Sequence, residues 1–151
     1  MAPAVDQLLL SAITFLPLAV GLVLVAAAAT LRGLPDAVFR LAGLATTALC
    51  FLLSLQLFAA FDPTNPGYQF VEYRSWIPGY GINYFVGIDG ISLVLVLLTT
   101  FLMPVVLLAS AHDPSKSVKS YIFFMLFLET GMLGAFVSLN VFQFYVFWEV
   151  M

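Results

Sequence analysis

Long apolar runs separated by short polar connectors dominate the chain. Uncharged runs occupy residues 8–31, 41–61 and 91–111, and two further runs at 121–139 and 141–151 contain only isolated polar side chains. A helix needs about 20 apolar residues to cross the hydrocarbon core of a bilayer. The pattern therefore predicts an all-α integral membrane protein with about five transmembrane helices, the fifth of which is truncated.

The composition supports this class of protein. Of the 151 residues, 63% are hydrophobic and 9% are charged, which lies outside the range of soluble globular domains. The few basic residues are scattered and form no patch that would bind nucleic acid. We therefore expect a single membrane domain over 1–151 with the lipid bilayer as its surroundings and no nucleic-acid partner.

The first run has a competing interpretation as a cleavable signal peptide, because small residues precede Thr30. Its leader carries no Lys or Arg and the run is too long for such a peptide, which favours a membrane helix. Pro17 is expected to bend this helix and to free a carbonyl group that neighbouring helices must bind. In the second run, Cys50 has no disulfide partner and no metal-ligand spacing around it, so we expect it to pack.

The segment 62–90 is rich in Pro, Gly and Tyr and is the one sizeable extramembrane stretch. Its residues 68–77 and 82–88 are rich in aromatic and β-branched residues, and 78–81 supply turn chemistry, which predicts a β-hairpin. Aromatic side chains of this kind settle at the headgroup interface. The hairpin is expected to lie on the membrane or against a neighbouring subunit through Tyr68, Tyr73, Trp76, Tyr80 and Tyr84.

Three polar residues stand at predicted span boundaries. Asp89 is expected to cap the third helix by accepting the amide of Ser92, although ion binding is an alternative, and Asn140 is expected to cap the fifth. His112 stands beside Asp113, which favours a solvated histidine over a proton-relay residue.

The basic residues predict the orientation. Arg32 and Arg40 follow the first span and Lys116 and Lys119 follow the third, whereas the long loop carries only Arg74. The positive-inside rule therefore places the N-terminus and the hairpin outside the cytoplasm, which is the periplasmic side if the membrane is a bacterial inner membrane.

Two carboxylates, Glu129 and Glu149, interrupt the last two apolar runs. Each lies roughly 15 Å from the turn at 138–140, at 1.5 Å per residue, which is near the bilayer midplane. A charge there costs about 2.5–3.5 kcal/mol. The predicted spans contain no Lys or Arg as a partner, although the Tyr145 hydroxyl lies one turn before Glu149. We predict proton handling by both, against the alternative of neutral carboxyl groups that only hydrogen-bond a neighbouring helix.

The fourth run also carries small residues at helical spacing. Gly131, Gly134, Ala135 and Ser138 form a stripe on the side of the helix away from Glu129. Such stripes allow close helix approach in membranes. We therefore expect this helix to be packed on two sides.

Two segments resemble the N-terminal region of chain M of the proton-pumping NADH-quinone oxidoreductases, respiratory complex I, a family similar to mitochondrial subunit four and to Mrp antiporter subunits. They are WIPGYGINYFVGIDGISLVLVLLTTF (76–101) and LETGMLGAFVSLNVFQFYVFWEVM (128–151), in which GIDG-x-S and F-W-E-x-M are the most diagnostic patterns.

The resemblance implies a membrane-arm translocase subunit that takes part in proton translocation coupled to quinone reduction. It implies no redox centre and no cofactor in this chain, and it implies other membrane subunits, the antiporter-like chains L and N, as partners. Glu149 matches the family's functional glutamate on the fifth helix, which pairs with a lysine on a later helix. Glu129 matches a glutamate found in only some relatives, and Asn140 stands where many relatives carry Asp.

The resemblance implies two inverted helix repeats that start at the fourth helix of family members. Because this sequence reaches only the fifth helix, it reads as the N-terminal part of a longer subunit. Two alternatives stay open. One is a cation/proton antiporter or membrane-hydrogenase paralogue, and the other is a purely structural membrane subunit whose carboxyl groups remain neutral.

Overall fold

The structure, a computed structural model, describes residues 8–31, 33–110 and 117–151. In these ranges the helices are α1 (Leu9–Thr30), α2 (Asp36–Ala60), α3 (Gly90–Ala109), α4 (Val118–Val137) and α5 (Val141–Val150). Helices α1 to α4 are each long and apolar enough to cross a membrane, as the sequence predicted. The expectations for Arg32, His112, Asp113 and Lys116 lie outside the described residues.

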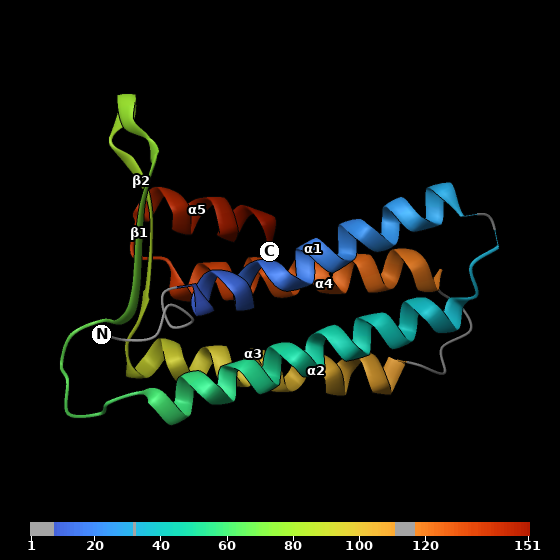
Figure 1. Ribbon diagram of the computed structural model, residues 1–151, viewed down its shortest axis with the longest axis horizontal. Coiled ribbons are helices and arrows are strands. Elements are labelled where there is room, and N and C mark those ends of the chain that lie inside the picture. Colours follow the sequence, from blue (N-terminus) through green and yellow to red (C-terminus); the bar gives the residue numbers. More distant parts are fainter. Residues whose placement is uncertain (1–7, 32, 111–116) are drawn as a thin grey trace.

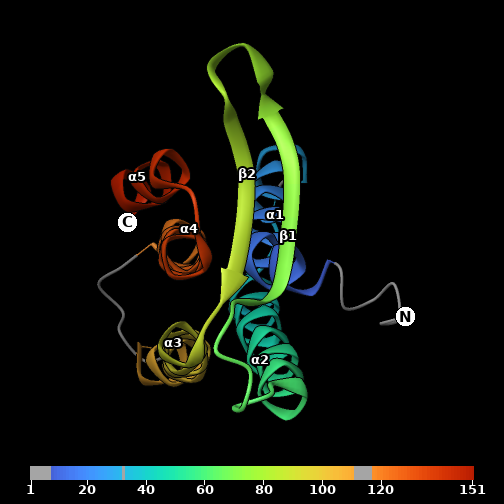
Figure 2. The same cartoon turned by 90° about the vertical axis from the view of Figure 1, so that its left-hand side faces the viewer.

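Helices α1 to α4 form a bundle in which α1 packs on α4 and α2, and α3 packs on α2 and α4 (Figure 1). Helix α5 lies beside α4, on the side away from α2 and α3 (Figure 2). Only a third to a half of the residues in the most apolar stretch of each spanning helix are buried, and the others are half-buried or exposed. The bundle therefore presents a broad apolar exterior, as expected for helices that face lipid or further helices.

The second helix begins earlier than predicted. We expected it to start at residue 41, after Arg40, but α2 begins at Asp36 and includes Arg40. Pro35 precedes the helix in extended conformation and Asp36 provides an acidic first turn, and both are favourable at a helix N-terminus. The uncharged run 41–61 omits this first turn because the run stops at Arg40. An arginine can nevertheless lie inside a membrane helix, because its long side chain extends the charged group out of the apolar region.

The hairpin consists of the antiparallel strands β1 (Gln69–Ile77) and β2 (Ile82–Ile88), joined by a 3₁₀ turn. Gly81 ends that turn with a φ of 66°, a conformation that glycine adopts without strain. The hairpin crosses one end of the bundle, and its tip projects beyond the helices (Figures 1 and 2). Of its expected interfacial aromatics, Tyr84 alone turns inward; the exposed ones are Tyr68, Tyr73, Trp76 and Tyr80.

Strand β2 is bonded to the turn between α4 and α5. The Phe85 amide donates to Gln143 Oε1 at 2.9 Å, and the Phe85 carbonyl accepts the Leu139 amide at 2.9 Å. Val86 also forms a bridge with Ser138. The hairpin and the α4–α5 turn are therefore one continuous hydrogen-bonded unit.

Both expected helix caps are present. Asp89 accepts the Ser92 amide at 2.8 Å and its own amide donates to Ser92 Oγ, so the two residues form a capping box. The Asn140 side chain accepts the amides of Phe142 and Gln143 at the start of α5. These bonds set the starts of α3 and α5.

Two apolar clusters stabilise the bundle, one near the hairpin and one near the opposite end. The first includes Leu10, Ile13, Leu57, Val96 and Leu133, and the second consists of Leu24, Phe39, Leu107, Ile122 and Leu126. On each of the four helices, buried polar side chains lie between the residues of the two clusters.

Candidate functional site

The buried polar side chains form a band at mid-length of the four-helix bundle. Every helix from α1 to α4 contributes, and each member is at least nine-tenths buried. Most of the hydroxyl groups donate to a carbonyl one turn back on their own helix, and Ser54 also bonds Thr100 across the α2–α3 contact at 2.8 Å. The band consists of Thr14, Thr46, Thr47, Cys50, Ser54, Thr99, Thr100, Glu129 and Thr130.

Pro17 interrupts the hydrogen-bond ladder of α1 within this band. Because proline has no N–H, the Ile13 carbonyl one turn earlier loses its helical partner. The Cys50 thiol donates to that carbonyl at 3.9 Å, and the neighbouring Leu18 amide donates to Thr130 Oγ1 at 3.1 Å. Side chains from α2 and α4 thus bind the backbone beside Pro17, and Cys50 does more than pack.

Glu129 lies in the polar band and is completely buried. Neither of its carboxyl oxygens has a hydrogen-bond partner among the described residues, and the Thr14 hydroxyl is likewise unpartnered. The Cys50 thiol lies within electrostatic range of the carboxyl group. The hydrogen bond to a neighbouring helix that a purely structural Glu129 would make is therefore not found in the described part of the chain. Buried polar atoms without partners mark places where water, an ion or a functional role must be considered.

Glu149 lies on the exposed side of α5 rather than in the band. No hydrogen bond joins it to Tyr145 in the described ranges, and Tyr145 is itself exposed. Gly131 lies against Val150 and Met151, so the two carboxylates sit within roughly one helical turn of the same level. The structure therefore places Glu129 and Glu149 at a similar level along the bundle, with Glu129 buried on α4 and Glu149 exposed on α5.

The small-residue stripe forms the contact between α4 and α5. A methyl group at Gly134 would overlap the Phe147 ring, and one at Gly131 would lie 3.3 Å from the Met151 amide. Ala135 is also buried. The expectation that α4 is packed on two sides is confirmed, because its other side faces α1, α2 and α3.

Glu72 is a buried carboxylate that the sequence analysis did not single out. Its Oε1 accepts the Ser11 amide at 3.1 Å and its Oε2 accepts the Ser11 hydroxyl, which also contacts the Tyr84 hydroxyl at 2.7 Å. The Ser11 amide is in the first turn of α1, where Leu8 provides no side-chain cap. Glu72 therefore caps α1 from β1, where the positive end of the helix dipole favours an anion.

The surroundings of Ser11 and Glu72 also affect the pKa of the Tyr84 hydroxyl. Burial raises the pKa of its hydroxyl above the usual value of 10.0, and the negative charge of Glu72 acts in the same direction, whereas the bond to Ser11 and the charge of Arg74 lower it. From the sequence, the alternation of side chains along β1 would identify Glu72 only as a residue that faces the helix bundle. Its partner, Ser11, comes from another part of the chain and leaves no local signal.

Among the described residues, no three His, Cys, Asp or Glu side chains gather closely enough to hold a metal ion. What the polar band can do chemically is bind and release a proton at the Glu129 carboxyl group. Burial disfavours the charged form of a carboxyl group and a nearby cation favours it, so a change in either alters proton occupancy.

Known proteins resemble the chain closely. The chain is 50% identical over 146 residues to NADH-quinone oxidoreductase subunit M of Rhodobacter capsulatus, covering 95% of this chain and 27% of that protein. It is 43% identical over 110 residues to NADH-ubiquinone oxidoreductase chain 4 of Arabidopsis thaliana, covering 73% of this chain and 22% of that protein. It thus spans about a quarter of the length of the curated relatives it matches.

A solved structure and a family model agree with these relatives. A chain of respiratory complex I from Thermus thermophilus with bound NADH superposes with a TM-score of 0.71 at 27% identity, over 93% of this chain and 26% of that one. The model of the amino terminus of NADH-ubiquinone oxidoreductase chain 4 matches residues 34–135. The chain therefore belongs to the NADH-ubiquinone oxidoreductase chain 4 family.

Proposed function

We propose that this chain forms the N-terminal part of a membrane-arm subunit of NADH-quinone oxidoreductase and takes part in its proton translocation. The names of its relatives support the complex, and the geometry of Glu129 supports the proton chemistry. The observation that carries the proposal is a wholly buried carboxyl group at mid-length of a spanning helix, with no hydrogen-bond partner among the described residues.

In this proposal Glu129 exchanges a proton when the electrostatic surroundings of the polar band change. An approaching cation favours the charged carboxylate, and its withdrawal favours the neutral acid. Thr130 follows Glu129 on α4, and the unpartnered Thr14 hydroxyl on α1 belongs to the same polar band, so the band supplies hydroxyl groups without a fixed charge.

Glu149 is proposed as the second proton-binding carboxylate. Its exposure on α5 leaves it open to a partner on a later helix of the full-length subunit, in keeping with the lysine that the family resemblance implies. We propose that α5 continues as the fifth span and that the antiporter-like chains L and N are neighbours in the complex. We further propose that the chain holds no redox centre or cofactor, so that its contribution is translocation alone.

The test uses the full-length subunit in the assembled complex, comparing Glu129→Gln, Glu149→Gln and Glu149→Asp. NADH-driven proton pumping and NADH oxidation are measured at equal complex abundance. We expect both glutamine variants to lower pumping, with the larger loss for Glu149→Gln, and Glu149→Asp to retain part of it. The control is Asp62→Asn, because Asp62 lies in the exposed loop after α2. Pumping unaltered in both glutamine variants would contradict the proposal.

The proposed orientation places the hairpin in the periplasm and the opposite end of the bundle in the cytoplasm. Arg40 and Lys119 lie at that opposite end, and Arg74 lies on the hairpin. Tyr80 at the hairpin tip is 84% exposed, so a Tyr80→Cys variant should react with an impermeant thiol reagent added from the periplasmic side. Cys50 is wholly buried and serves as the unreactive control. Labelling only from the cytoplasmic side would invert the orientation.

A further inference from the structure

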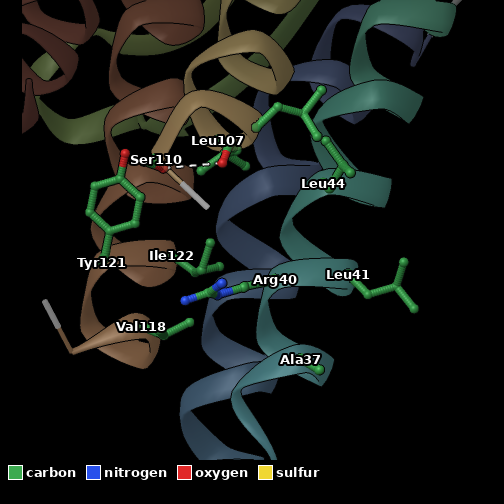
Figure 3. A pocket seen from close by; sticks show the side chains of 10 residues that line it. Ala37, Arg40, Leu41, Leu44, Leu107, Ser110, Val118, Tyr121 and Ile122 are labelled. Atoms are coloured by element: carbon green, nitrogen blue, oxygen red, sulfur yellow. Dashed lines mark hydrogen bonds between the residues drawn. The ribbon is translucent and has the colours of Figure 1, made fainter. Parts of the chain in front are cut away.

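A pocket of about 300 Å³ lies between α2, α3 and α4 at the end of the bundle opposite the hairpin (Figure 3). Its walls are almost entirely apolar and include Leu41, Leu44, Leu107 and Leu108. Ile122 forms part of its lining and packs against Gly43, where an added Cβ would lie 2.8 Å from Ile122 Cγ2. The close approach of α2 and α4 at Gly43 therefore limits the pocket on its inner side.

The pocket opens sideways, towards the surroundings of the bundle. Leu41 is 69% exposed and Leu108 is 56% exposed, so its rim continues into the exposed apolar surface of α2 and α3. An apolar cavity of this kind binds hydrocarbon in preference to water. The occupant should therefore carry a hydrocarbon chain that enters from the bilayer.

One side of the pocket carries a positive charge. The Arg40 side chain extends from α2 towards Val118 on α4 (Figure 3). Lys119, the next residue on α4, places its Nζ 5.2 Å from the centre of the Phe39 ring on α2. Two cations from two helices thus lie at this end, against one described acid, Asp36, in the first turn of α2.

The other polar side chains of the pocket, Ser110 and Tyr121, each already have an interaction. Ser110 Oγ donates to the Leu107 carbonyl at 3.1 Å (Figure 3). Arg40 also has an interaction of its own, but a guanidinium group carries five N–H donors and can serve several acceptors. Arginine is thus the side chain through which a head group would be recognised.

We propose that this pocket binds an anionic phospholipid, with one acyl chain between the leucines and the phosphate against Arg40. Guanidinium groups bind phosphate oxygens through paired charge-assisted hydrogen bonds, and basic pockets between membrane helices recognise anionic head groups. The lateral opening, the apolar walls and the arginine at one side fit an amphipathic anion and not a soluble metabolite, and Lys119 adds positive charge at the same end of the bundle. The proposal concerns lipid binding and is independent of proton translocation.

The experiment uses the assembled complex with the full-length subunit, reconstituted into nanodiscs of phosphatidylglycerol and phosphatidylcholine. One of the two lipids at a time carries a diazirine in its acyl chain, and crosslinked peptides are mapped by mass spectrometry. We expect phosphatidylglycerol to label the peptides around Leu44 and Leu107 more than phosphatidylcholine does. Arg40→Gln should reduce that preference by roughly tenfold, and Arg40→Lys should keep part of it.

Two tryptophan variants separate the pocket from general lipid contact. Leu44→Trp should fill the pocket and abolish labelling there by either lipid, whereas Leu52→Trp on the exposed surface of α2 should leave it unchanged. Three results would each overturn the proposal. They are equal labelling by both lipids in the unmodified protein, an unchanged preference in Arg40→Gln, and undiminished labelling in Leu44→Trp with the complex intact.

Discussion

The thiol of Cys50 on α2 donates a hydrogen bond to the carbonyl of Ile13 on α1, with a distance of 3.9 Å between Sγ and the oxygen. This carbonyl lacks its usual donor because Pro17 stands one turn further along the helix. A proline in a membrane helix is tolerated when a neighbour binds the freed backbone group. The pair therefore joins α1 to α2 beside the buried carboxyl group of Glu129.

Replacing Cys50 by valine should destabilise the protein. Valine has a similar size but no donor, so the Ile13 carbonyl would be left unbound in the bundle, at a cost of about 1–3 kcal/mol. Cys50→Ser keeps a donor and should be milder. Thermal unfolding of the full-length subunit in detergent measures both. Equal stability of Cys50→Val and the unmodified protein would show that the thiol contributes only volume.

Gly134→Ala should weaken the contact between α4 and α5. The added methyl group overlaps the Phe147 ring, and overpacking of this kind costs about 1–3 kcal/mol. Combining it with Phe147→Leu should recover part of the loss, because the smaller side chain vacates the space. Thermal unfolding of the single and double variants gives the coupling. Gly79→Ala is the matched control, since a Cβ at Gly79 meets nothing within 4 Å.

Glu72→Ala should loosen the start of α1. It removes the acceptor of the Ser11 amide and hydroxyl, and losing such a cap costs about 0.5–2 kcal/mol. Glu72→Gln retains an acceptor and should have a smaller effect. Hydrogen exchange of the peptide containing Ser11, measured by mass spectrometry, reports directly on the bonded amide. Exchange that is unchanged in Glu72→Ala would contradict the cap.

Acidification should weaken the cap of α3. Hydrogen bonds from the backbone and side chain of Ser92 hold the pKa of Asp89 below its usual value of 3.8. A lowered pKa in the folded state means that this stabilisation is present above pH 3.8 and disappears as the pH falls through the folded-state pKa. Asparagine caps a helix nearly as well and has no charge to lose.

The comparison of unmodified protein with Asp89→Asn isolates this effect. Thermal unfolding midpoints should be similar near neutral pH, and below pH 4 the unmodified protein should lose more stability than the variant does. Parallel acid curves for the two proteins would mean that the charge of Asp89 contributes nothing to the cap.

The four spans could be located from sequence because membrane insertion imposes a length on apolar runs. The caps at Asp89 and Asn140 were also predictable, since a cap binds amides two or three residues along the same chain. The Gly131 stripe was predictable as a contact surface because helical periodicity gathers its members on one face. In each case the structure is decided by interactions between residues close in the sequence or by the surrounding bilayer.

Contacts between distant segments could not be predicted in the same way. Glu72 reads as an ordinary strand residue until Ser11, which is 61 positions away in the sequence, is placed against it. The role of Cys50 depends on where α1 passes α2, and the burial of Glu129 depends on three neighbouring helices. The exposure of Glu149 depends on how α5 packs, which the stripe on α4 sets only in part.

Phe85 on β2 is hydrogen-bonded to Leu139 in the α4–α5 turn and to Gln143 at the start of α5, and Val86 pairs with Ser138. A tilt of α5 must therefore break these bonds or carry the hairpin with it. Because the hairpin tip projects well beyond the helices (Figure 1), a small rotation at the turn becomes a larger displacement at Tyr80. The hairpin is therefore coupled to α5, the helix that carries Glu149. A probe attached to the hairpin tip would report the movement of that helix from outside the bundle.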